Sequence, residues 1–166
     1  NIFCLSLVVL LNAWCANAQD VPAYRASLLG DTNGELKKWH KITLGFSGPE
    51  SSETDDVNPF TDYRLDVTFS HGASGKSYVV PGYFAADGNA ANSGATQGSV
   101  WLAHFTPDET GEWAYDVSFT TGENVAQNGG GESARSFDGA AFFFNVEDSD
   151  KTGRDLRGKG RLQYVG

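Results

Sequence analysis

The chain has 166 residues and a formal net charge of −9 at pH 7, and 40% of its residues are hydrophobic. This length suits one domain with its own core and is too short for a β-sandwich plus a complete catalytic barrel. Its acidic balance speaks against nucleic acid as a partner, because nucleic-acid binding depends on basic groups that neutralise phosphates.

Residues 1–18 have the pattern of a secretory signal peptide whose initiator methionine is missing from the sequence. Ile2 to Leu11 is an apolar run of the length of an h-region, and Ala16-Asn17-Ala18 fits the small-x-small rule for cleavage before Gln19. The run is too short for a transmembrane helix, which needs about twenty apolar residues. We therefore expect a secreted, periplasmic or cell-surface protein with no transmembrane segment.

The predicted cleavage also removes both cysteines, Cys4 and Cys15. The mature chain would then have no disulfide and no thiolate metal site, so packing alone must hold it together. We expect residues 19–38 to form an N-terminal segment ahead of one module at 39–148.

Residues 39–148 carry the pattern of an all-β module. Apolar and polar residues alternate, glycine-rich polar clusters separate the runs, and no segment between them keeps a helical period for ten residues. The expected strands are Trp39–Phe46, Tyr63–Ser70, Ser77–Phe84, Ser99–Thr106, Glu112–Thr120 and Ala140–Val146. Each has one apolar side, and His71 to Gly75 is typical of a hairpin connection. Two antiparallel sheets packed face to face are the simplest solution for such a pattern.

The segment Asn58-Pro59-Phe60-Thr61-Asp62 is expected to be a structural loop. Proline fixes its own backbone and biases Asn58 to an extended shape, so the side chains of Asn58 and Asp62 can cap the loop while Phe60 enters the core. The acidic residues just before it could instead collect a calcium ion through oxygen ligands, although a solvated loop is favoured. These residues are Glu50, Glu53, Asp55 and Asp56.

The loop from Pro81 to Ala91 is the candidate binding site for sugar. Aromatic rings stack on pyranose faces, and amide and carboxylate groups can accept hydroxyl hydrogen bonds. The candidate residues are Tyr83, Phe84, Asp87 and Asn89. The alternative, which is favoured, is that Tyr83 and Phe84 plug the end of the sandwich core.

The stretch around Asp108-Glu109-Thr110-Gly111 is a turn that opens directly into a strand. Trp113, Tyr115, Val117 and Phe119 then share one face, which suits a sheet corner where an aromatic residue ties the loop to the sandwich. We expect Asp108, Gly111, Trp113 and Tyr115 to be structural. Trp39 and Trp101 also fall on alternating patterns and are predicted core anchors.

Charge is spread unevenly, because residues 19–150 hold twenty acidic and seven basic residues whereas the remaining tail holds one acidic and five basic ones. Interleaved glycines indicate a solvated linker at 149–166 rather than a site for an anionic polymer.

Five blocks of sequence resemble an immunoglobulin-like domain of unknown function. They are Lys38–Leu44, Asn58–Leu65, Val80–Gly88, Trp101–Pro107 and Gly111–Tyr115. In that family the domain precedes the (β/α)8 barrel of secreted glycoside-hydrolase-like enzymes. The resemblance implies an immunoglobulin-like β-sandwich, and it implies that the tail leads into a missing C-terminal catalytic domain. It supplies no catalytic residues.

Catalysis by this module has no support in the sequence. Glycoside hydrolysis needs two facing carboxylates, one with a raised pKa, and the candidates Asp62, Asp66, Asp87, Glu109 and Glu112 are better explained as solvated surface. The three histidines show no paired metal-ligand spacing, so no metal or other cofactor is expected. The resemblance therefore implies a non-catalytic accessory module of a secreted glycoside-hydrolase-like enzyme, which packs on or orients the C-terminal catalytic domain. The alternatives are a carbohydrate-binding module with polysaccharide as partner, and an extracellular protein-interaction domain of immunoglobulin type.

Overall fold

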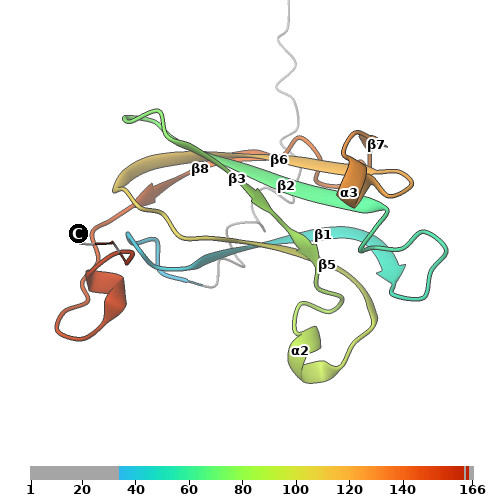
Figure 1. Cartoon of the computed structure of the whole chain (residues 1–166), viewed down its shortest axis with the longest axis horizontal. Coiled ribbons are helices and arrows are strands. Elements are labelled where there is room, and N and C mark those ends of the chain that lie inside the picture. Colours follow the sequence, from blue (N-terminus) through green and yellow to red (C-terminus); the bar gives the residue numbers. More distant parts are fainter. Residues whose placement is uncertain (1–33, 163, 165–166) are drawn as a thin grey trace, which may run out of the picture.

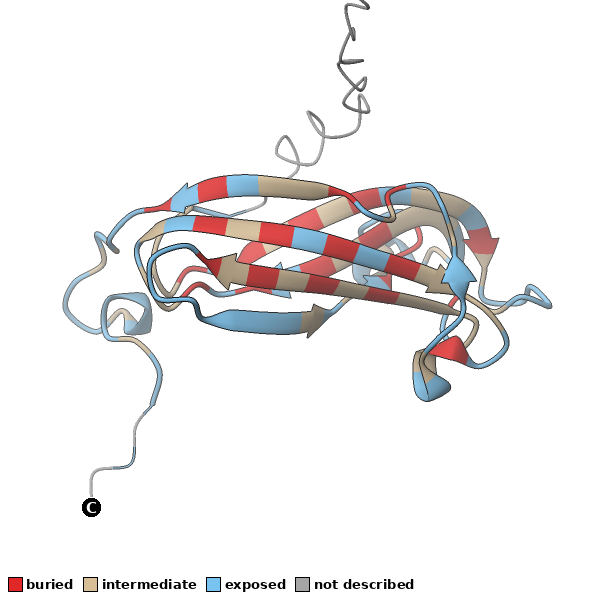
Figure 2. Ribbon diagram, turned by 90° about the horizontal axis from the view of Figure 1, so that it is seen from above, coloured by how far each residue is buried: buried red, intermediate tan, exposed pale blue. Residues whose placement is uncertain are grey.

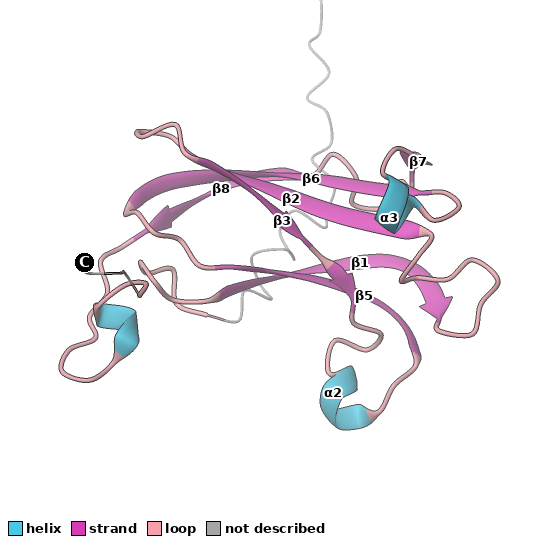
Figure 3. Ribbon diagram, in the orientation of Figure 1, coloured by secondary structure: helices cyan, strands magenta, loops and turns pink. Residues whose placement is uncertain are grey.

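The computed structural model describes residues 34–162 and 164. The predicted signal peptide and most of the predicted N-terminal segment 19–38 lie outside the described residues. The strands are β1 (Ile42–Ser52), β2 (Tyr63–His71), β3 (Ser77–Pro81), β4 (Tyr83–Phe84), β5 (Gln97–Phe105), β6 (Gly111–Thr121), β7 (Glu132–Ser133) and β8 (Ala141–Val146) (Figure 3). Two single-turn helices, α2 (Ala90–Ser93) and α3 (Val125–Asn128), and a 3-10 turn, η1 (Leu156–Gly158), complete the elements.

The strands form two antiparallel sheets that stack as two layers (Figure 1). The smaller sheet has the order β1-β5-β4, and the larger sheet has the order β3-β2-β6. The far edge of β6 is shared, because β8 pairs with its first half and β7 pairs with its last two residues. The all-β sandwich expected from the alternation is therefore confirmed.

The alternation of side chains puts one face of every long strand in a common core. Buried and exposed residues alternate along the ribbons in Figure 2, and Val67 opposes Val117 while Phe69 opposes Tyr115 across β2 and β6. Phe69 also stacks on Phe105 of the other sheet at a centroid distance of 3.9 Å, which joins the two layers. The largest fully buried side chains are Trp101, Trp113, Tyr115, Phe46, Phe69, Phe119 and Phe137. Packing of aromatic rings thus dominates the interior.

The chain changes sheets at Gly82. The predicted single strand Ser77–Phe84 is in fact two, because β3 pairs with β2 in the larger sheet and β4 pairs with β5 in the smaller one. The amide of Gly82 donates to the carbonyl of Leu65 at 2.8 Å. A Cβ at this position would lie 2.3 Å from the Leu65 side chain, so only glycine allows this close approach.

Trp39 does not lie on a strand, which corrects the sequence expectation. It adopts a φ of 66° in a turn, and β1 begins three residues later at Ile42. Its amide donates to the carbonyl of Pro107 at 2.8 Å, and its half-buried ring lies against Gly160 of the C-terminal segment. Trp39 therefore packs against the C-terminal segment and is not a member of the buried core cluster.

The described part of the C-terminal segment folds back on residues 35–39. Lys37 and Glu147 form a parallel bridge, and the amide of Lys38 donates to the Glu147 carbonyl at 2.8 Å. Asp155 accepts from the amide of Arg157 at the start of η1. Ser149, Asp150, Lys151 and Gly160 contact residues 35–40, whereas residues 152–154 and 156–159 are exposed. The linker role expected for 149–166 stays a prediction.

Candidate functional site

The predicted corner before β6 is built from a buried tryptophan and a network of charges. Trp113 is fully buried, and its Nε1 donates to the carbonyl of Glu109 at 3.1 Å, so the ring ties the turn to the sandwich. Asp108 accepts from Lys76 Nζ at 3.0 Å and from the Tyr78 hydroxyl at 2.9 Å. Burial raises the pKa of Asp108, but these two hydrogen bonds outweigh it and leave the pKa below its ordinary value.

The same corner holds buried His71, which lies at the end of β2. Its Nε2 donates to the Thr110 carbonyl at 2.9 Å, while Nδ1 lies 2.8 Å from the Glu109 carboxylate. The hydrogen bond from Lys76 is the largest cause of the lowered pKa of Glu109. Lys76, His71, Asp108 and Glu109 each pair with a neighbour in this corner, although the buried Oδ1 of Asp108 has no hydrogen-bond partner among the described residues. A structural role for the corner stays a prediction.

The Asn58–Asp62 loop is capped as expected, but Phe60 does not enter the core. Asn58 Oδ1 accepts from the Phe60 amide, and Asp62 accepts from the amides of Asn58 and Asn124, all at 2.9 Å. Phe60 is 52% exposed, and its ring lies at 77° to that of Phe84, with 5.9 Å between the centroids. The hydrogen-bonded turn, and not burial, fixes this ring.

The sugar-site candidates of the 81–91 loop fall in three different places. Phe84 is buried, as the core-plug alternative requires, whereas Tyr83 is 45% exposed on the opposite face of β4. The Tyr83 hydroxyl lies 3.0 Å from His104 Nε2. Exposed Asp87 accepts from the amide of Asn89 ahead of α2, so both residues order their own loop. The four residues therefore do not converge on one site.

A pocket does open beside β4, at the edge where the two sheets meet. We call it the edge pocket; its volume is about 200 Å³, and it is lined by Pro59, Phe60, Tyr63, Arg64, Leu65, Asp66, Pro81, Gly82, Tyr83, Phe84, Trp101 and Ala126. Tyr83 and Phe84 are the two predicted site residues that line it. Arg64 Nε donates to Asp66 Oδ2 at 2.6 Å within this lining.

A second, wider hollow lies on the outer face of the smaller sheet. It includes Thr43, Tyr83 and His104. His104 Nδ1 and Nε2 are within 2.9 Å of the Thr43 hydroxyl and 3.0 Å of the Tyr83 hydroxyl. Partial burial, followed by the charge of Lys41, lowers the pKa of His104, which favours the neutral ring at pH 7. The two hydroxyls therefore occupy both nitrogens of this ring.

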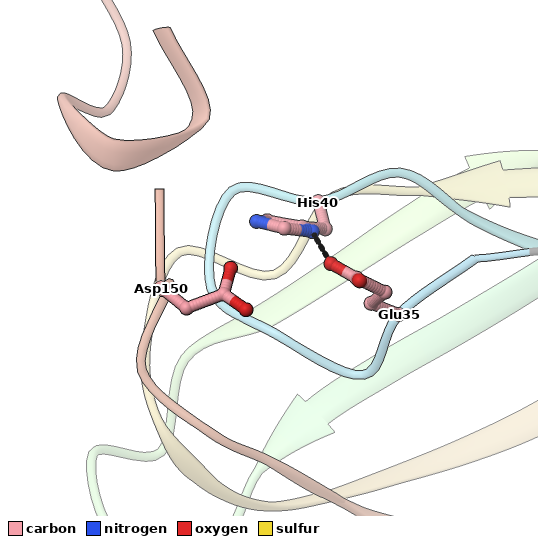
Figure 4. Close-up of side chains that lie close together, drawn as sticks. All are labelled: Glu35, His40 and Asp150. Atoms are coloured by element: carbon pink, nitrogen blue, oxygen red, sulfur yellow. Dashed lines mark ion pairs between the residues drawn. The ribbon is translucent and has the colours of Figure 1, made fainter. Parts of the chain in front are cut away.

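One group of three metal-type ligands occurs among residues 34–162 and 164. It consists of Glu35, His40 and Asp150, whose side chains converge between the two ends of the described chain (Figure 4). His40 is buried, with Nδ1 2.8 Å from Glu35 and Nε2 3.0 Å from the Ser149 hydroxyl. Glu35 and Asp150 are exposed.

Lysines already fill the positions that a cation would take in this cluster. Lys151 Nζ lies 3.3 Å from Glu35 and 2.9 Å from Asp150, and Lys37 Nζ lies 2.6 Å from Asp150. The hydrogen bond from Lys151 is the largest cause of the lowered pKa of both carboxyls. The arrangement is an ion-pair clamp, and we refer to Glu35, Lys37, Asp150 and Lys151 by that name below.

The acidic loop proposed for calcium is exposed at all four carboxylates. Asp55 Oδ2 accepts from the amide of Ser52 at 2.7 Å, which closes the turn after β1. No other part of the described chain beyond the Glu35, His40 and Asp150 cluster brings three such ligand atoms together. Calcium at this loop stays a prediction.

Two features of the edge pocket were missed from the sequence. Phe60 was assigned to the core because it follows a proline in a loop, although its position between two capping residues could have indicated a presented side chain. Asp66 was explained as solvated surface, and Arg64 was not singled out. Side chains in a strand alternate between its two faces, so Arg64 and Asp66 lie on the same face. Opposite charges at this spacing could have indicated that the two side chains pair.

The structure defines a β-sandwich domain with an aromatic pocket at one edge and an ion-pair clamp at its ends. None of the helices in the described part of the chain has the length and apolar character needed to cross a bilayer. The chain belongs to the family described as "Domain of unknown function (DUF5060)", whose model matches residues 35–120, just over half of the chain.

Two further comparisons complete the picture. No curated protein matches the chain. Among solved structures, it is similar to one described as "a putative glycoside hydrolase from Bacteroides vulgatus", with 23% sequence identity and a TM-score of 0.46 over 69% of this chain. The match spans 16% of that protein's chain.

Proposed function

We propose that this chain is the N-terminal accessory module of a larger, secreted glycoside-hydrolase-like enzyme. The module is itself non-catalytic, and it packs on or orients a catalytic domain that follows in the same polypeptide. The order of the five sequence blocks supports this reading, because the family that they resemble has this arrangement.

The observation that carries the proposal is the exposed apolar surface of the C-terminal segment. Leu156, Leu162 and Tyr164 are 68%, 94% and 96% exposed. The segment just before Leu162 is held in place by the ion-pair clamp and by the contact of Gly160 with Trp39. Three large apolar side chains exposed on one short segment, which is anchored as far as Gly160, would suit a surface that another folded unit covers.

The carboxyl groups of the described residues support a non-catalytic role. A glycosidase acid needs a pKa raised above its ordinary range. Every carboxyl here with a clear shift has a lowered pKa, because each accepts hydrogen bonds; these residues are Glu35, Asp62, Asp87, Asp108, Glu109, Asp150 and Asp155. Such groups stay ionised at neutral pH and are poor proton donors.

The test compares the 166-residue chain with the longer product of its gene. Hydrogen exchange at residues 156–164 should slow at least tenfold in the longer protein, whereas the β2–β3 hairpin tip at 72–76 should exchange equally in both. Glycoside hydrolysis should be measurable only for the longer protein. A stop codon directly after Gly166, unchanged exchange at 156–164, or turnover by the 166-residue chain would each contradict the proposal.

A pair of variants in the longer protein sharpens this test. Leu162→Ser should lower its melting temperature, because it places a hydroxyl in the buried contact. Val79→Ser is the control, since Val79 is 64% exposed on β3 and belongs to no proposed contact. Equal effects of the two substitutions would count against a covered C-terminal segment.

A further inference from the structure

The edge pocket has an aromatic floor that reaches into the core. Phe84 lies 5.3 Å from Trp101, and Trp101 lies 5.4 Å from Tyr63, measured between ring centroids. Phe60 lines the pocket while 52% exposed, with its ring at 77° to that of Phe84. The volume of about 200 Å³ is below the roughly 300–1,000 Å³ of pockets for drug-sized ligands, so it suits a ligand of one ring.

Phe60 is presented to solvent by a rigid loop. Besides the caps from Asn58 and Asp62, the carbonyl of Asn58 accepts from the amide of Asp62 at 2.8 Å, and the carbonyl of Thr61 accepts from the amide of Ala126 at 3.0 Å. These hydrogen bonds order the backbone that carries the half-exposed Phe60 ring, and Phe84 is its ring neighbour. A ring ordered in advance can bind a ligand face at a low entropic cost.

The polar groups of the pocket form one neutral pair with spare bonding capacity. The bond between Arg64 and Asp66 uses Nε and Oδ2. Within the described chain, no other hydrogen bond occupies Asp66 Oδ1 or the two terminal amino groups of Arg64. The pair can thus offer two donor groups, with four N–H bonds between them, and one acceptor oxygen to neighbouring hydroxyls while adding no net charge.

We propose that the edge pocket binds one neutral hexopyranose unit of a polysaccharide. The apolar C–H face of the sugar lies on Phe60, and adjacent hydroxyls bond to Arg64 and Asp66. A neutral sugar is favoured over a uronic acid, because the chain carries a net charge of −9 and the nearest cation is already paired. This binding does not depend on whether the module also packs on a catalytic domain.

The experiment is native gel electrophoresis of the 166-residue chain in gels that contain a polysaccharide. Glucomannan, galactomannan and mixed-linkage β-glucan, which are hexose polymers, serve as neutral probes, and polygalacturonate serves as the acidic one. We expect retardation by at least one neutral probe and none by polygalacturonate. Phe60→Ala should raise the apparent dissociation constant at least tenfold, and Asp66→Asn should do the same.

Each variant has a matched control outside the pocket. Phe143→Ala removes a ring that is 64% exposed on β8, and Asp116→Asn changes an exposed carboxylate on the same face of the larger sheet as Asp66. Both controls should bind as the parent does. Melting curves of all four variants separate lost binding from lost folding.

Several outcomes would overturn the assignment. These are no retardation by any neutral probe, stronger retardation by polygalacturonate, or equal effects of Phe60→Ala and Phe143→Ala. Binding that survives both Phe60→Ala and Asp66→Asn would place the sugar elsewhere on the molecule. None of these results bears on the covered C-terminal segment, so the two proposals fail separately.

Discussion

Trp113 is the residue on which the corner before β6 depends. Its ring is fully buried, lies 5.1 Å from Phe105 and 4.9 Å from His71, and donates its N–H to the turn. Trp113→Ala should therefore cost about 3–5 kcal/mol of unfolding free energy, the range for buried aromatic truncations. Urea denaturation would measure it, with Tyr83→Ala as the comparison because Tyr83 is half exposed. A larger shift of the midpoint for Tyr83→Ala would refute the corner assignment.

Asp62 gives the Asn58–Asp62 loop a dependence on pH. Its pKa is lowered mainly by the hydrogen bond from the Asn124 amide and then by that from Asn58. Because the folded-state pKa is below the unfolded one of about 3.9, the carboxylate stabilises the fold fully above that pH and loses this effect as the pH falls further. The melting temperature of Asp62→Asn should be lower than that of the parent at pH 7, and the difference should shrink below about pH 4. A difference that stays constant down to pH 2 would show that the charge is irrelevant.

The sequence predicted some of these residues well and others poorly, for a physical reason. Trp101 and Trp113 lie within long strands, where side chains alternate between the two faces, so the period of two determines which way they point. Phe60 and Trp39 lie in turns, where side-chain direction depends on hydrogen bonds and tertiary contacts that no local pattern encodes. The edge pocket, in which Phe60, Arg64 and Asp66 are proposed to bind sugar, forms only because β2 and β4 meet at one edge.

The boundary between β3 and β4 lies at Gly82 and depends on the absence of a Cβ atom at this residue. A Cβ would lie 2.3 Å from the Leu65 side chain and 2.9 Å from the Leu102 carbonyl, so Gly82→Ala should push the two sheets apart and cost about 1–3 kcal/mol, as overpacking does. Gly72→Ala is the control, because its Cβ would have only an ordinary contact at 3.6 Å and its φ is not positive. Chemical denaturation of both variants checks this. Equal stabilities would mean that the change of sheet tolerates a side chain.

The passage of the chain between the two sheets at Gly82 also separates the strands that the sequence predicted from the one that it did not. Six long runs of alternation were recognisable, and five of them appear as β1, β2, β5, β6 and β8. The sixth divides into β3 and β4 because consecutive apolar and aromatic residues give no sign of where the chain leaves a sheet. The two-residue β7 and the single-turn α2 and α3 are too short to have a period.

At the scale of the whole molecule, the ion-pair clamp joins segments that are more than a hundred residues apart. The hydrogen bond with Asp150 is the largest cause of the raised pKa of Lys151, so both groups are charged over the neutral range. Exposed ion pairs contribute little to global stability, and their attraction weakens in salt. The clamp therefore fixes the direction of the C-terminal segment more than it stabilises the sandwich.

Lys151→Ala should free that segment while leaving the core intact. We expect the amides of Gly158, Lys159 and Gly160, which bond within the η1 turn, to exchange several-fold faster, with a melting temperature within about 2 °C of the parent. Salt at 1 M should have a similar effect on the parent, because the Debye length falls to about 3 Å. Lys41→Ala is the control, since Lys41 forms no ion pair within the described chain. If Lys151→Ala and Lys41→Ala exchange alike, the contact of Gly160 with Trp39 holds the segment and the charges do not.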